Sequence, residues 1–231
     1  MKTIGLIGGM SWESSQVYYE IINKKVKEIL GGFHSCKSVM LSVDFAEVET
    51  LQHKNDWEAL NKMMADSAMN LQAAGADLIV LCTNTMHLCS DAIKAATDIP
   101  FLHIAEATGQ EIIRRNMTRV GLLGTRFTME KDFYKTVLRD NYNIEVIVPL
   151  PEDRRKIHDI IYNELVHGKI REESKSIYQN IIKELEKAGA EGVILGCTEI
   201  PLLISDADVS LPVFDTTKIH AEKAVELALK D

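Results

Sequence analysis

The sequence predicts an α/β protein built from two similar units, each a parallel sheet flanked by helices. Short apolar runs alternate with amphipathic stretches along all 231 residues, the order of parallel strands joined by right-handed helical crossovers. Several of these runs are almost wholly apolar, as expected for strands that are covered on both faces. Hydrophobic residues make up 46% of the chain, enough for one large domain or two small ones.

The individual strands and helices can be placed by their residues. The clearest strands are six runs: Ile4–Ile7, Ser38–Val43, Leu78–Cys82, Val120–Leu123, Ile144–Val148 and Val193–Leu195. Hydrophobic residues recur at helical spacing in Asp56–Ala74 and in Ser174–Ala188. We expect Asn55 to cap the first of these helices with Glu58 as its reciprocal partner, and Gly189 to end the second.

Three segments of the first half recur in the same order in the second half. The matches are Lys2–Gly8 with Thr118–Gly124, Ala74–Leu81 with Ala188–Leu195, and Ile99–Leu102 with Leu211–Phe214. The separation between matched residues changes by only a few positions from one match to the next. Because this period is too long for a solenoid, the pattern predicts a twofold duplication of an α/β unit.

Composition argues against several classes of protein. The chain has 26 basic and 34 acidic residues and a net charge of −8, so we expect neither nucleic acid nor an anionic membrane as a partner. No apolar run approaches the roughly 20 residues that span a bilayer, and Lys2–Met10 is typical of a first strand rather than of a signal peptide. The four cysteines form no CxxC pair and have no zinc spacing with histidine. We therefore expect a cytoplasmic protein with free thiols.

Polar residues follow the strands of the second match. Continuing that match past its strands pairs Thr83 with Cys197, Asn84 with Thr198, and Thr85 with Glu199. Because parallel sheets bind ligands beyond the carboxyl ends of their strands, we expect Thr83 and Cys197 on opposite sides of a shared cleft. A thiolate there is a competent base, and positive surroundings or a helix N-terminus can lower the pKa of a thiol from about 8.5. The sequence does not fix the protonation state of Cys197, which sits at such a turn. This arrangement suits a proton that leaves one face of a carbon and returns on the other.

Three motifs resemble those of the aspartate/glutamate racemase family: Ile4–Met10, Asn84–His87 and Gly196–Glu199. The resemblance covers essentially the whole chain. It implies a racemase that needs no cofactor, an active site in the cleft between two pseudo-symmetric domains, and a homodimer. The family layout places residues 1–101 and 217–231 in the first domain and 102–216 in the second.

The sequence departs from this family in its first half, where the family has a catalytic cysteine. That cysteine falls on Thr83, and Cys82 lies one residue too early. A shift of one residue in a strand points the side chain to the opposite face, and the internal repeat also pairs Cys197 with Thr83. The resemblance then makes Cys197 the base for the L enantiomer, while Thr83 or a water that it holds serves the opposite face. A threonine hydroxyl is a far poorer base than a thiolate, so we expect slow racemisation with distinct L and D kinetics. The equilibrium itself is unchanged, because the two enantiomers have equal free energy.

Substrate-binding residues are predicted around both strand ends. Backbone N–H groups of the turn Gly8–Ser11, which includes Met10, and of its repeat at Thr125 are suited to a carboxylate. Asn84, Thr85, Thr198 and Glu199 are placed to orient the ammonium and α-carboxylate groups, although strand-end capping also explains the threonines.

A cation is needed for a second carboxylate on the substrate. The resemblance implies Arg171, or else Lys169, in this role. A further arginine of the family has no counterpart here, and Gln52 is the residue that could replace it through its amide. This loss admits glutamate or neutral amino acids such as homoserine beside aspartate.

Other functions stay open at this point. The alternatives are a racemase of broader specificity, a cysteine-dependent decarboxylase or isomerase of the same superfamily, and a small-molecule binding module that lost turnover with the first cysteine. A pyridoxal-phosphate racemase is disfavoured because no lysine lies in either strand-end motif. His87 either tunes the site or caps and packs its helix.

Overall fold

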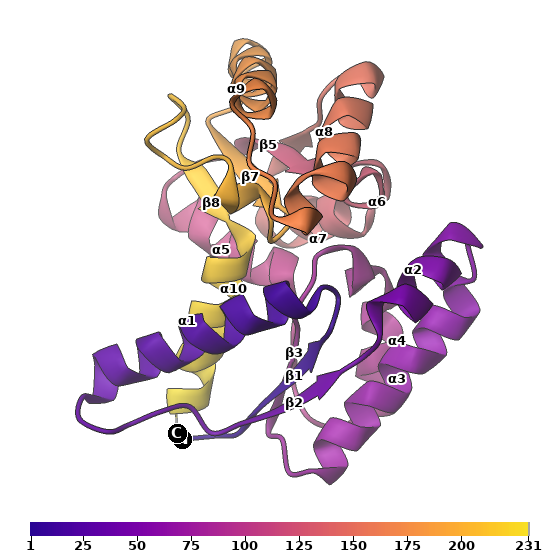
Figure 1. Ribbon diagram of the computed structural model, residues 1–231. Coiled ribbons are helices and arrows are strands. Elements are labelled where there is room, and N and C mark those ends of the chain that lie inside the picture. The colour runs from indigo at the N-terminus through magenta and orange to yellow at the C-terminus, as the bar shows by residue number, and fades with distance from the viewer. Residues whose placement is uncertain (231) are drawn as a thin grey trace. The chain divides into compact units, whose positions relative to one another are not determined.

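The computed structural model describes residues 1–230 and contains two α/β units (Figure 1). The first unit comprises Met1–Ile104 and the chain from His220 onward, and the second comprises Ala105–Ile219. Each unit has one four-stranded, wholly parallel sheet. The predicted α/β class with two parallel sheets is therefore confirmed. Within residues 1–230 no helix is both long and apolar enough to cross a bilayer.

The first sheet has the strand order β2-β1-β3-β4. Its strands are β1 (Ile4–Gly8), β2 (Ser38–Ser42), β3 (Leu78–Leu81) and β4 (Phe101–Leu102). Its helices are α1 (Trp12–Leu30), α2 (Phe45–His53), α3 (Trp57–Ala73), the 3-10 helix η1 (Thr85–Cys89), α4 (Ser90–Ala96) and α10 (Thr216–Leu229). In Figure 1, α3 and α4 cover one face of this sheet, and α1 and the later part of α10 cover the other.

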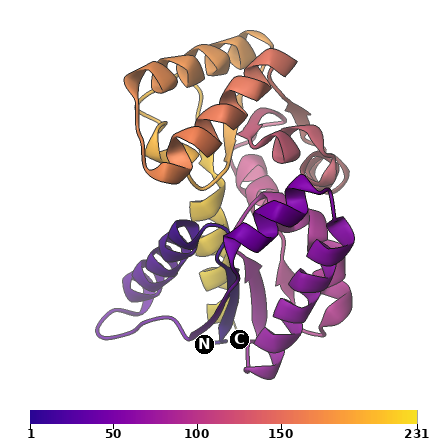
Figure 2. The same cartoon turned by 45° about the vertical axis from the view of Figure 1, so that its right-hand side comes forward.

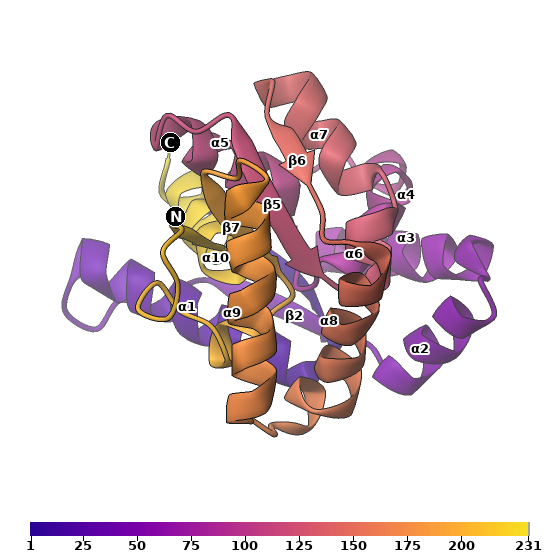
Figure 3. The ribbon, with the colours of Figure 1, turned by 90° about the horizontal axis from the view of Figure 1, so that it is seen from above.

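The second sheet has the matching order β6-β5-β7-β8. Its strands are β5 (Arg119–Gly124), β6 (Glu145–Ile147), β7 (Gly192–Gly196) and β8 (Val213–Asp215). Its helices are α5 (Ile104–Arg114), α6 (Arg126–Glu130), α7 (Phe133–Tyr142), α8 (Pro151–Asn163), η2 (Leu165–His167), α9 (Glu172–Lys187) and η3 (Ile200–Leu202). Figure 3 shows α8 and α9 side by side over β5 and β7, where their apolar residues form one core with Leu123, Val193 and Leu195.

The two sheets share their register as well as their order. Gly5 lies beside Ile79 in the first sheet, and the matching residues Gly121 and Val193 lie side by side in the second. The hydrogen bonds at the beginnings of β1 and β5 also match. The N–H of Thr3 donates to the Asp77 carboxylate, and the N–H of Arg119 donates to the Glu191 carboxylate. The internal repeat predicted from the sequence is thus confirmed by the pairing of equivalent residues.

The expected strands agree with the observed ones to within one residue at either end. The predicted cap of α3 is wrong by one residue. The side chain of Asp56, not that of Asn55, accepts the N–H of Ala59. Asn55 has the left-handed φ of +56° and accepts the indole N–H of Trp57 instead. Glu58 is consequently one position too near the helix start to reciprocate.

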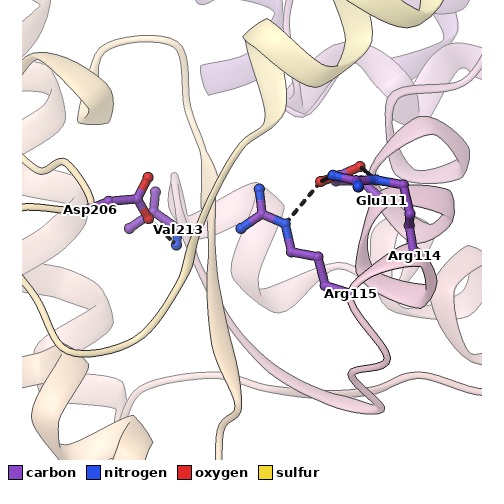
Figure 4. Close-up of polar contacts among 5 residues, drawn as sticks. All are labelled: Glu111, Arg114, Arg115, Asp206 and Val213. Atoms are coloured by element: carbon purple, nitrogen blue, oxygen red, sulfur yellow. Dashed lines mark hydrogen bonds and ion pairs between the residues drawn. The ribbon is translucent and has the colours of Figure 1, made fainter.

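Local contacts fix the beginning of the chain and the last strand of the second sheet. In the first unit the N–H of Lys2 donates to the carbonyl of Ala228, so the first residues lie beside the end of α10 (Figure 2). In the second unit Asp206 accepts the N–H of Val213 on the edge strand β8 at 2.8 Å (Figure 4). The Arg115 guanidinium, which pairs with Glu111, lies 4.8 Å from the ring centre of Phe214 on the same strand.

Three buried histidines meet in the first unit: His87, His103 and His220. The ring of His87 lies 4.6 Å from that of His103 and 5.7 Å from that of His220, centre to centre. Burial lowers the pKa of His103 to about 3 and that of His220 to about 4, and it holds the pKa of His87 well below its usual value. All three are therefore neutral at pH 7.

These shifts predict a loss of stability in mild acid. A histidine has a pKa near 6.5 in the unfolded chain. Below pH 6.5 the unfolded state therefore binds protons that the folded state does not bind. The free energy of unfolding should fall by roughly 1.4 kcal/mol per pH unit for each buried histidine, from pH 6.5 down toward pH 4. Urea unfolding between pH 7.5 and 4.5 measures this slope. His220→Gln should make the slope shallower, whereas exposed His34→Gln should not; a flat curve in the wild type would refute the assignment.

Candidate functional site

Thr83 follows β3 at the carboxyl edge of the first sheet. Its N–H donates to the carbonyl of Leu81 at 2.9 Å, and its carbonyl lies 2.8 Å from Nδ1 of His87. The Thr83 side chain is half-buried, whereas Asn84 and Thr85 beside it are buried. The three residues therefore form one turn, with Thr83 its most accessible member.

Cys82 has no exposed surface. Its carbonyl accepts the hydroxyl of Ser14 in α1 at 2.9 Å, and burial raises the pKa of its thiol far above the ordinary value. A thiol that is both buried and hard to ionise is a poor carrier of protons to a substrate. The environment thus differs sharply between Cys82 and its neighbour Thr83.

Gln52 of α2 is brought next to this turn. Its amide Nε2 donates to Sδ of Met86, which lies between Thr85 and His87. The Met10 side chain packs into the core instead of lying at the surface. In the turn before it, the N–H of Gly9 donates to the hydroxyl of Ser15 at 2.8 Å, so that donor already has an internal partner.

Cys197 directly follows β7 at the carboxyl edge of the second sheet. Its thiol donates to Oε2 of Glu199 at 2.9 Å, and the hydroxyl of Thr198 donates to the same oxygen at 2.8 Å. Cys197 and Glu199 are each 9% exposed. The sequence motif therefore forms a compact cluster in which a nucleophilic sulfur and a carboxylate share one hydrogen bond.

The pKa of the Cys197 thiol is raised well above its usual value, first by burial and then by the negative charge and hydrogen bond of Glu199. The backbone N–H groups of Thr198 and Glu199 act in the opposite direction and are outweighed. The thiol is therefore protonated in this structure, which the sequence had left open. The turn leads into a single 3-10 turn, η3, which Glu199 precedes as its N-cap residue.

Sequence reasoning missed two residues near this cluster. Tyr178 of α9 is buried, and burial followed by the charges of Cys197, Glu164 and Glu199 raises its pKa. In the sequence, Tyr178 has the spacing of an ordinary core residue of its helix. No pattern marked Glu164 either, because its partners come from the next loop and helix.

Glu164 organises the segment that carries the predicted cations. It accepts the hydroxyl of Ser174 at 2.5 Å and forms an ion pair with Arg171 at 3.5 Å. Its carbonyl accepts the N–H of Lys169 at 2.9 Å. Both cationic side chains are exposed, and Arg171 already has an acidic partner.

Thr125 caps α6, and its hydroxyl accepts the N–H of Thr128 at 3.3 Å. The Thr125 side chain therefore serves as a helix cap. Within residues 1–230 no group of three or more His, Cys, Asp or Glu side chains is arranged to hold a metal ion. The predicted residues thus gather into three groups: the Thr83 turn with Gln52, the Cys197 cluster, and the loop tied to Glu164.

Known proteins resemble the chain over its whole length. A candidate Asp/Glu racemase from Yersinia pestis is 51% identical, with a TM-score of 0.95 and 100% of each chain covered. An aspartate racemase homologue from Pyrococcus horikoshii is 38% identical, with a TM-score of 0.87 and the same coverage. The broad-specificity amino-acid racemase RacX of Bacillus subtilis is 22% identical over 98% of both chains.

The Asp/Glu/Hydantoin racemase family matches residues 7–224. This range includes both strand-end motifs, Asn84–His87 and Gly196–Glu199. The chain therefore belongs to the Asp/Glu/Hydantoin racemase family and is an isomerase of the amino-acid racemase type.

Proposed function

We propose that the protein is a cofactor-independent racemase of aspartate or glutamate that works by proton transfer at the α-carbon. Cys197 takes the proton from the L enantiomer, and Thr83, or a water bound to it, supplies a proton to the opposite face. The observation that carries this proposal is the hydrogen bond from the Cys197 thiol to the Glu199 carboxylate at the carboxyl end of β7. We further propose that the enzyme acts as a cytoplasmic homodimer.

The hydrogen bond to Glu199 supplies a route for ionising the sulfur. A thiolate and a carboxylate in contact repel one another, so the pair retains one proton in the resting enzyme. A substrate ammonium group beside the sulfur stabilises the thiolate, so that the thiol proton can pass to the Glu199 carboxylate. The thiolate then removes the α-proton and becomes a thiol again, while the Thr83 side donates a proton to the opposite face. Glu199 releases its proton to solvent, and solvent replaces the proton that the Thr83 side donated.

The two sides of this reaction differ in strength. A threonine hydroxyl is a far weaker base than a thiolate, so removal of a proton from the D enantiomer is the harder direction. Because the enantiomers have equal free energy, kcat/KM must nevertheless be the same for both directions. The asymmetry therefore changes kcat and KM separately, with slow turnover in both directions.

A broader specificity is the second candidate, and one observation favours it. Arg171, the expected partner of a side-chain carboxylate, already pairs with Glu164. Lys169 is then the cation left for an acidic substrate, and neutral amino acids such as homoserine compete better. The similarity to a broad-specificity racemase is in line with this reading.

The first test is loss of the α-hydrogen in heavy water. Proton NMR with L-aspartate and L-glutamate should show exchange by the wild type, and Cys197→Ala should slow it roughly 100- to 10,000-fold because the general base is gone. Cys36→Ala, which removes a thiol in another part of the chain, is the matched control and should retain the rate. Exchange at full rate in Cys197→Ala would mean that another group is the base.

The identity of the group on the opposite face is tested by variants of two adjacent residues. Thr83→Cys should accelerate racemisation because a thiol ionises far more readily than a hydroxyl, and Thr83→Ala should slow it. Cys82→Ala should leave the rate close to that of the wild type. The opposite pattern, with Cys82 essential and Thr83 dispensable, would overturn the register argument.

Glu199→Gln separates activation of the thiol from its simple burial. Loss of the negative charge should lower the pKa of Cys197, so alkylation by iodoacetamide at pH 8 should become faster. Turnover should nevertheless fall, by roughly 100-fold, because the acceptor for the thiol proton is lost. Cys197→Ala gives the background alkylation of the other thiols. If alkylation and turnover rise together, Glu199 is an inhibitor of the sulfur and not its partner.

A further inference from the structure

His87 is wholly buried, and its two ring nitrogens have different partners. Nδ1 lies 2.8 Å from the carbonyl oxygen of Thr83, and Nε2 accepts the N–H of Ile104 at 3.1 Å. A carbonyl oxygen can only accept, so Nδ1 must carry the proton; a backbone N–H can only donate, so Nε2 must be bare. These contacts fix a single neutral tautomer.

The surroundings of His87 maintain this neutral form. The rings of His103, His220 and Phe101 lie 4.6, 5.7 and 5.5 Å away, centre to centre. Neither neighbouring histidine is an acid that could stabilise an imidazolium. A second ring proton would also break the bond from Ile104, leaving two N–H groups pointing at one another. The tautomer is thus imposed by contacts from β4 and α5 as well as by burial.

The ring connects the ends of two strands. Thr83 follows β3, and Ile104 lies just beyond β4. Together with the bond from the Thr83 N–H to Leu81, the imidazole leaves both peptide groups of Thr83 hydrogen-bonded. These bonds fix the backbone of Thr83 and so the direction of its Cα–Cβ bond, from which the hydroxyl extends.

The second half of the chain lacks this device. The internal repeat places Pro201 at the position equivalent to His87. Proline has no N–H group, in its ring or its backbone, that could donate a hydrogen bond. The carbonyl of Cys197 accepts the backbone N–H of Ile200 instead, at 3.3 Å. The imidazole therefore supports the threonine side of the duplication and has no counterpart on the cysteine side.

We propose that His87 is a positioning residue for the racemase reaction, and that its Nδ1–H tautomer holds the Thr83 backbone in the conformation that delivers a proton. The inference rests on the proposed role of Thr83. A weak proton donor depends on correct orientation more than a thiolate does, because a misplacement of about 1 Å can cost roughly 100-fold in rate. His87 thereby contributes to inversion without touching the substrate.

Two amide variants separate the two hydrogen bonds of the ring. The amide nitrogen of His87→Asn falls near Nδ1 and can still donate to Thr83, whereas the longer His87→Gln reaches the position of Nε2 and can still accept from Ile104. Both remove the ring, so both should lose stability. His220→Gln is the matched control, because His220 is buried in the same cluster but bonds Tyr18 and Leu102.

The readout is the ratio of inversion to α-hydrogen exchange with retention, measured with L-aspartate in heavy water. Exchange with retention needs Cys197 alone, and inversion also needs the Thr83 side. His87→Gln should lower the ratio roughly 10- to 100-fold, while His87→Asn should stay within about threefold of the wild type. An equal ratio in His87→Gln and His220→Gln would overturn the positioning role while leaving the racemase proposal intact. Absence of any exchange in the wild type would instead defeat the proposed function, and this role with it.

A measurement on the wild-type protein tests the His87 tautomer even if the His87 variants fail to fold. Nitrogen-15 NMR of the imidazole at pH 7 should show Nδ1 protonated and Nε2 bare at His87, while His220 should show the reverse. His220 donates through Nε2 to the Leu102 carbonyl and accepts at Nδ1 from Tyr18. An Nε2–H tautomer at His87 would rule out the bond to Thr83, and a charged ring would rule out the bond from Ile104.

Discussion

The register of the buried parallel strands is the constraint on which the rest of the structure depends. β1, β3 and β7 are buried along their whole length, and β5 is buried except at Arg119, so a slip of one residue would turn apolar side chains away from their cores. This pairing decides which residue first emerges beyond each strand. It buries Cys82 and leaves Thr83 accessible, although sulfur chemistry alone would favour the cysteine.

The Cys197 cluster shows how a site can keep its reactive group inactive until it is needed. Burial and the charge of Glu199 hold the sulfur protonated, which protects a thiol that would otherwise be open to alkylation and oxidation. The same carboxylate is the nearest acceptor for the thiol proton. A cationic group of the substrate would reverse the balance, so that ionisation and binding are coupled.

The three buried histidines combine a loss of stability in acid with well-defined hydrogen bonds. Keeping three imidazoles neutral sacrifices stability in mild acid. In return each ring nitrogen of His87 and of His220 has a defined partner. The His87 ring is hydrogen-bonded to the carbonyl of Thr83 and so helps to fix the backbone of that residue.

The sequence by itself determined the α/β class, the strands to within one residue, and the equivalence of Thr83 with Cys197. Strand periodicity and an internal repeat can both be recognised from the order of the residues alone. The sequence misplaced the cap of α3 by one residue and left the protonation state of Cys197 open. Only the tertiary structure decided the partner of the thiol, the tautomer of His87, and the roles of Tyr178 and Glu164. Such features depend on contacts between residues far apart in the chain and on the burial of side chains. Neither contacts of this kind nor burial produces a periodic pattern in a single sequence.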